Sequence, residues 1–133
     1  MATWTDVQDY LQTELGAKEI DTDRLAVVLP PPVDGGEPVS MVVVHPVTDD
    51  PSADQVILRI VVAKVEDVDL PTALGLAGTA SRGGLVSGAG TVLLTHSFML
   101  QQLSAQEARA LTAVTAAHLV SVLQQIRTAA IKG

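Results

Sequence analysis

The 133-residue chain contains no cysteine, and it has only one Trp, one Tyr and one Phe. The absence of cysteine excludes disulfide bonds, thiolate zinc sites and cysteine nucleophiles. The three aromatic residues, Trp4, Tyr10 and Phe98, are too few and too dispersed to form the stacking platforms on which single-stranded nucleic acids bind. The hydrophobic core must therefore consist mainly of aliphatic side chains.

Charged side chains are scarce in the second half of the sequence. Residues 1–69 hold 14 of the 15 acidic and four of the eight basic side chains, so the formal charge is −10 there and +3 in the rest. The charged residues of the second half are Arg82, Glu107, Arg109, Arg127 and Lys132. A 64-residue segment with five charges cannot cover much surface with solvated side chains, so we expect part of it to face another protein.

The overall charge and the hydropathy pattern exclude two classes of partner. A net charge of −7 argues against a nucleic acid, because affinity for a phosphate backbone rests on clustered Lys and Arg. The N-terminal sequence predicts no secretory signal, because acidic residues appear by position 6 and no basic or apolar region precedes them. Residues 110–126 are uncharged but too polar for a transmembrane helix. We expect a cytoplasmic protein that binds neither nucleic acid nor membrane.

The first half of the sequence predicts one helix and three strands. Apolar residues recur every three or four positions from Trp4 to Leu15, Thr3 and Thr5 are both suitable N-caps, and Gly16 follows the last apolar residue. An acidic turn is expected around residues 21–23. Strands are predicted at residues 24–29, 39–45 and 55–65. The last of these has the strongest β-strand signal, because aliphatic side chains occupy both of its faces and place it at the centre of the sheet.

The second half predicts a helix, a hairpin and a long helix. The first helix is expected at residues 70–80, and residues 82–84 form a flexible connection to strands at 85–87 and 91–99. Ser104 and Glu107 have the spacing of a capping box, which predicts a helix from there to about Ala130. The fold class is therefore α+β: a single domain, residues 1–133, with an antiparallel five-stranded sheet in the order α-β-β-β-α-β-β-α.

Two opposite faces of the last predicted helix are apolar. One broad stripe is expected to pack on the sheet and comprises Ala108, Leu111, Val114, Thr115, His118, Leu119, Val122 and Ile126. The other face consists of small residues, Ala110, Ala113, Ala116, Ala117 and Val120. Two interpretations of this face remain open. It is either an alanine-rich surface chosen for helix propensity, or a protein interface where small side chains permit close approach.

Signals for catalysis, metal binding and cofactor binding are weak. His45, His96 and His118 show no metal-ligand spacing, and a buried core role is favoured for His118. Ser87 lacks the G-x-S-x-G pattern, and residues 83–91, GGLVSGAGT, lack the features of a phosphate-binding loop. The clustered acidic residues lack the pattern of a calcium loop. We therefore predict no catalytic residue, no cofactor and no metal site.

The junction before the last helix resembles a known family. The sequence SFML at residues 97–100, followed by LSAQE at 103–107, is similar to the strand-to-helix junction of the type III secretion chaperone-like fold, and within it of the YbjN-type family. The resemblance covers nearly the whole chain in layout and residues 85–126 in pattern. The sequence departs from the family pattern at residues 80–84, ASRGG, where the family has an asparagine and a Pro-Phe-Gly-like motif.

The resemblance implies a non-enzymatic protein-binding domain, chaperone-like or regulatory, that acts as a homodimer and binds a polypeptide client. One alternative is a small-ligand binding or enzymatic domain with a pocket between the sheet and the last helix, in which His96 and His118 supply the polar groups. Another is a roadblock-like scaffold subunit, which would place two strands before the middle helix. Three predicted strands at that point favour the chaperone-like order.

Overall fold

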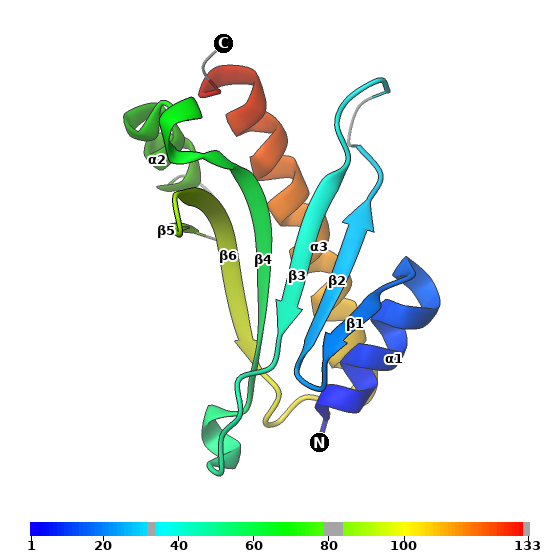
Figure 1. The fold of residues 1–133 in the computed structure, drawn as a ribbon. Coiled ribbons are helices and arrows are strands. Elements are labelled where there is room, and N and C mark those ends of the chain that lie inside the picture. The colour runs from blue at the N-terminus through cyan, green and yellow to red at the C-terminus, as the bar shows by residue number, and fades with distance from the viewer. Residues whose placement is uncertain (32–33, 79–83, 132–133) are drawn as a thin grey trace.

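A computed structural model of the chain describes residues 1–31, 34–78 and 84–131. It contains one antiparallel sheet, three α-helices and two short 3-10 helices (Figure 1). The elements are α1 (Trp4–Leu15), β1 (Lys18–Asp21), β2 (Arg24–Leu29), β3 (Val39–Val44), η1 (Pro51–Ala53), β4 (Gln55–Lys64), η2 (Val65–Asp67), α2 (Leu70–Gly78), β5 (Gly84–Gly88), β6 (Thr91–Met99) and α3 (Ala105–Ala129).

The sheet has the strand order β1-β2-β3-β4-β6-β5, with every neighbouring pair antiparallel. Strands β4 and β6 form its longest pairing, which runs from Gln55 opposite Met99 to Lys64 opposite Thr91. The strongly apolar strand at residues 55–65 is therefore central, as its sequence predicted.

The predicted five-stranded sheet is wrong, because the sheet has six strands in the order α-β-β-β-β-α-β-β-α. The missing strand is β1, which the sequence analysis placed in a connection with an acidic turn. Three of its four residues are charged and all four are exposed, so it carries neither the alternation nor the aliphatic content of a strand. Its backbone pairs with β2, from Lys18 opposite Ala26 to Asp21 opposite Arg24.

The helices lie on one face of the sheet. Helix α1 packs on β2, α3 packs on β4 and β6, and α2 contacts α3 and β5 (Figure 1). Inward side chains of the strands, such as Leu58 and Ile60, meet Leu119 and Ile126 of α3 in one fully buried core. Burial of each such side chain contributes about 1.5–3 kcal/mol. Within the described residues no helix combines the length and apolarity needed to cross a membrane, and the cytoplasmic location stays a prediction.

Helix α3 begins as the sequence predicted, and of the two N-caps predicted for α1 the structure uses Thr3. Thr3 caps α1 and Ser104 caps α3, and each forms a reciprocal capping box with an acidic residue three positions later. Gly16 ends α1 with a φ of 66°, a left-handed conformation that favours glycine. Helix α2 is described to Gly78, so the predicted end of this helix and most of the connection at residues 82–84 lie outside the described residues.

The buried face of α3 is rotated relative to the predicted stripe. Val114 was expected in the core but is 50% exposed, whereas Thr112 and Leu123 are fully buried. Helices α1 and α2 both contact α3 beside the sheet, so the sheet is not its only neighbour. A helical wheel places residues around one axis but does not show which neighbours cover each side.

Candidate functional site

An apolar groove lies along the small-residue face of α3. Four of the five residues predicted to form an interface line it: Ala113, Ala116, Ala117 and Val120. Three of the four are alanines, whose short side chains leave space beside the helix axis. The fifth predicted residue, Ala110, is exposed on the same helix but does not line the groove.

The remaining walls come from α1 and from the end of β2. Tyr10 and Leu15 of α1 line the groove, as do Leu29 and Pro30. The hollow has a volume of about 380 Å³, and among the described residues that line it only Tyr10 has a polar side-chain group, its phenol. A cleft with such a lining is suited to apolar side chains of a ligand. The sequence analysis identified the α3 wall but not the α1 and β2 walls, because their residues are distant in the sequence.

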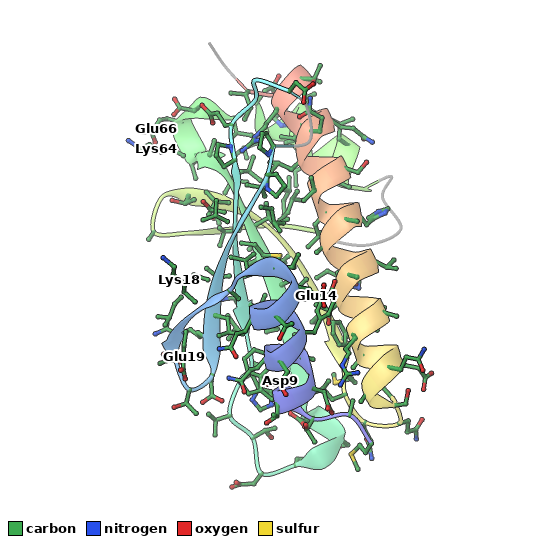
Figure 2. The ribbon with its side chains drawn as sticks, turned by 90° about the vertical axis from the view of Figure 1, so that its right-hand side faces the viewer. Asp9, Glu14, Lys18, Glu19, Lys64 and Glu66 are labelled. Carbon is green, nitrogen blue, oxygen red and sulfur yellow. The ribbon has the colours of Figure 1, made fainter. Side chains whose placement is uncertain are left out.

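The rim of the groove on the α1 side is acidic. Asp9, Glu14 and Arg109 border a neighbouring hollow that shares Tyr10 with the groove, and Figure 2 shows Asp9 and Glu14 on α1. Arg109 lies 3.9 Å from a carboxylate oxygen of Asp6 and is half-exposed. Arg109 is therefore paired with Asp6, whereas Asp9 and Glu14 have no ion pair within the described residues. These two acids give the groove a negative border.

The second candidate surface is the opposite face of the sheet. Within the described residues no helix covers this face, and α1 and α3 lie together on the other side in Figures 1 and 2. The alternation along the strands turns aliphatic side chains outward, including Val28 at 70%, Val61 at 37% and Met99 at 48% exposure. Ala26, Val42, Val44, Ile57 and Leu93 also lie on this face and are half-buried.

Arg59 stands at the centre of this open face. It occupies a row that crosses all six strands, formed by Lys18, Ala26, Val42, Arg59, Thr95 and Gly84 in register. On its own strand, its neighbours on the same face are Ile57 and Val61. The guanidinium is exposed and forms no ion pair or hydrogen bond within the part of the chain that the structure describes.

Among the six strands of the sheet, only the edge strand β1 contains acidic residues. Asp21 forms a 2.7 Å ion pair with Arg24, whose hydrogen bond is the main cause of the lowered pKa of the Asp21 carboxyl. Glu19 is the other acid of this strand. Strands β2, β3, β4 and β6 contain Arg24, Arg59 and Lys64 but no Asp or Glu.

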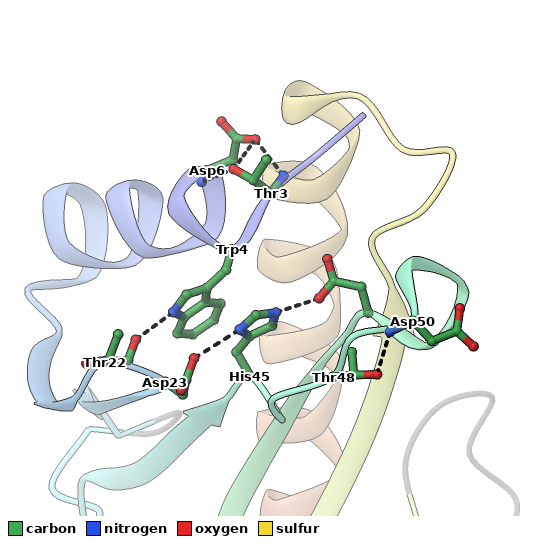
Figure 3. A network of polar contacts seen from close by, with 9 residues as sticks. Thr3, Trp4, Asp6, Thr22, Asp23, His45, Thr48 and Asp50 are labelled. Carbon is green, nitrogen blue, oxygen red and sulfur yellow. Dashed lines mark hydrogen bonds and ion pairs between the residues drawn. The ribbon is translucent and has the colours of Figure 1, made fainter.

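A histidine bridge joins elements at one end of the sheet. His45 Nδ1 lies 3.2 Å from Asp23 Oδ1, and His45 Nε2 lies 2.5 Å from Asp54 Oδ1 (Figure 3). The imidazole also stacks on Trp4, whose indole Nε1 donates a 3.0 Å hydrogen bond to the Thr22 carbonyl. Every contact joins segments distant in the sequence, so the bridge holds α1, the β1–β2 turn and the β3–β4 loop together.

The other histidines do not join this bridge. His96 lies on β6 and His118 on α3, and neither lines the groove. The Nε2 atom of His118 and the hydroxyl of Thr115 are buried and have no hydrogen-bond partner among the described residues. Within residues 1–31, 34–78 and 84–131, no three His, Cys, Asp or Glu side chains are grouped to hold a metal ion.

Comparison with known proteins identifies a similar fold but no family. No family model matches the chain, and no curated protein matches it. Among solved structures, a chain in the "Crystal Structure of the ExsC-ExsE Complex" aligns with a TM-score of 0.55 at 14% identity, covering 92% of each chain. The similarity supports the type III secretion chaperone-like fold that the sequence predicted. The narrower YbjN-type assignment stays a prediction.

Proposed function

We propose that this chain is a non-enzymatic protein-binding domain, chaperone-like or regulatory, that binds a polypeptide segment in the groove between α1 and α3. The observation that carries the proposal is the groove itself, where three short side chains of α3 face apolar residues of α1 and β2. Neither a nucleic acid nor a membrane is part of the proposal.

The shape and lining of the groove support a peptide as its ligand. An apolar helix or strand of a partner can place its side chains against Leu15, Leu29 and Val120, while the alanines let its backbone approach α3 closely. Catalysis requires polar groups that touch a reacting atom, and of the groove residues that the structure describes only Tyr10 supplies one. The fold similarity to a chain crystallised in a two-protein complex is consistent with this function.

The proposal includes a homodimer. Aliphatic side chains are exposed on α2 and at the edge strand β5, among them Leu70, Leu74 and Val86, in addition to those of the open face. This is a large exposed apolar surface for a 13.8-kDa monomer, and association would cover part of it. Light scattering over a series of dilutions should give the mass of two chains. A monomer mass at every concentration would contradict the dimer.

Substitution of Ala117 tests the groove. Affinity capture from native lysate with mass spectrometry should recover a polypeptide partner with the wild-type chain and much less of it with Ala117→Glu. The glutamate places a desolvated charge against the partner, which should weaken binding at least tenfold. Ala110→Glu is the matched control, because Ala110 is exposed on the same helix outside the groove. Equal capture by all three proteins would exclude the groove as the binding site.

A further inference from the structure

The strongest unexplained feature of the described chain is a cation at the centre of an apolar strand face. Arg59 is surrounded on the open face by Val42, Ile57, Val61 and Thr95, and it has no acidic partner within the described residues. Exposed arginines on strands are ordinary. The distribution of charge in this chain is unusual. The chain has 15 acidic and 8 basic residues, and yet its four longest strands contain no acidic residue.

We propose that the open face of the sheet binds a second polypeptide segment, one with acidic and aliphatic side chains, whose carboxylate pairs with Arg59. This proposal rests on the protein-binding function above and adds a separate surface with a different chemistry. The aliphatic side chains of the segment would cover Val28, Val61 and Leu93, while its acidic group would reach the guanidinium. A guanidinium can bind a carboxylate through two parallel hydrogen bonds, which gives geometric specificity.

Charge complementarity selects this occupant over a second copy of the chain. A symmetric dimer through the open face would bring the same patch of each chain together, so Arg59 would face another cation-bearing surface. Lys18 lies in the same row as Arg59, and Figure 2 shows it on the side of the sheet away from α3. Like charges in a desolvated contact are unfavourable. An acidic partner removes this repulsion.

The geometry also favours a polypeptide over a small carboxylic acid. Small-molecule sites are concave and enclose most of the ligand. The open face is a strand surface, and its aliphatic side chains extend from Val28 on β2 to Val86 on β5. A ligand that spans several strands and also reaches Arg59 must be extended, as a peptide segment is.

The test uses a displayed library of random 16-residue peptides selected on the purified full chain. The selected peptides should be enriched in Asp and Glu flanked by Leu, Ile or Val. A synthetic peptide from the selection should bind Arg59→Glu about tenfold or more weakly than wild type, and Arg59→Lys to an intermediate degree. Its Glu→Lys derivative should bind Arg59→Glu better than wild type. Amide chemical-shift changes should map to β3, β4 and β6.

A second variant keeps the test independent of any folding defect in Arg59→Glu. Thr95 is the register neighbour of Arg59 on β6. Thr95→Glu therefore supplies an internal carboxylate that competes with the peptide for the Arg59 guanidinium, and should weaken peptide binding. Circular dichroism checks that each variant is folded. The proposal fails if no peptide is selected, if the peptides show no acidic bias, if both variants bind them like wild type, or if the chemical-shift changes map to α1 and α3.

The outcomes separate this proposal from the proposed function. If Arg59→Glu leaves peptide binding unchanged while Ala117→Glu abolishes capture of the lysate partner, the groove function stands and the open-face proposal fails. If Arg59→Glu alters the mass measured by light scattering, a second copy occupies the face and the acidic-segment proposal is overturned. Loss of acidic-peptide binding in Arg59→Glu but not in Ala117→Glu supports two separate surfaces.

Discussion

The rings of Trp4 and His45 stack with their centroids 5.1 Å apart and their planes inclined by 8°. This contact joins the first turn of α1 to the residue that follows β3 (Figure 3). The two nitrogens of the same imidazole reach Asp23 and Asp54, so one side chain connects α1, the β1–β2 turn and the two ends of the β3–β4 loop. Side chains at such junctions contribute more to stability than their own burial suggests.

We predict that His45→Ala lowers the free energy of unfolding by about 2 kcal/mol, because it removes the stacking contact and two hydrogen bonds that involve carboxylates. Urea denaturation followed by circular dichroism measures the change. Val47→Ala is the control, since Val47 lies two residues further on and is 82% exposed. If the two substitutions are equally mild, the bridge does not stabilise the fold.

Neighbouring alanines on α3 should respond very differently to glutamate. Ala116 is buried, so Ala116→Glu places an unpaired charge in the core and should lower the free energy of unfolding by about 3 kcal/mol or more. Ala117 is exposed at the groove, so Ala117→Glu should cost about 0.5 kcal/mol or less in the unbound protein. Thermal or urea denaturation distinguishes the two. A large loss from Ala117→Glu would mean that it is buried by a neighbour.

The capping box of α3 should contribute measurably to stability. Ser104→Ala removes the hydroxyl that accepts a hydrogen bond from the Glu107 amide, and should cost about 1 kcal/mol. Ser121→Ala is the comparison on the same helix. Ser121 is exposed in the helix interior, where alanine has the higher helix propensity, so this change should be neutral or slightly stabilising. Equal effects in urea denaturation would show that capping is unimportant here.

The two capping boxes predict a loss of stability in acid. Hydrogen bonds from the Thr3 backbone to Asp6 and from the Ser104 backbone to Glu107 lower the pKa of each carboxyl below its ordinary value of 3.8 or 4.5. A lowered folded-state pKa means that the stabilisation is complete above the ordinary pKa and is lost as the pH falls through the folded pKa.

Urea denaturation at pH 7 and at about pH 3 measures this loss. Glu107→Gln cannot lose a charge at position 107, so the drop in stability between the two pH values should be smaller for this variant than for wild type. A drop of the same size in both would show that the Glu107 carboxylate makes no contribution to the acid sensitivity.

Much of the groove's α3 wall could be predicted because a helix repeats every 3.6 residues. Ala113, Ala116 and Ala117 therefore had to share one side of α3, whatever the rest of the fold. The other wall could not be predicted, since Tyr10 and Leu15 reach the groove only through the contact between α1 and α3. The helical wheel also placed Val114 in the core, although it is 50% exposed, and omitted Thr112, which is fully buried.

Sequence alone determined the features that depend on neighbours along the chain: the capped starts of α1 and α3, the glycine end of α1, and the central place of β4. Only the tertiary structure decided that β1 is a strand, because its hydrogen-bond partners belong to β2 and its exposed charged residues carry no apolar pattern. It also decided that Arg59 lies between Val42 and Thr95, since strand register across the sheet sets its neighbours. Local signals act over a few residues, whereas register and helix contacts are set by packing between distant segments.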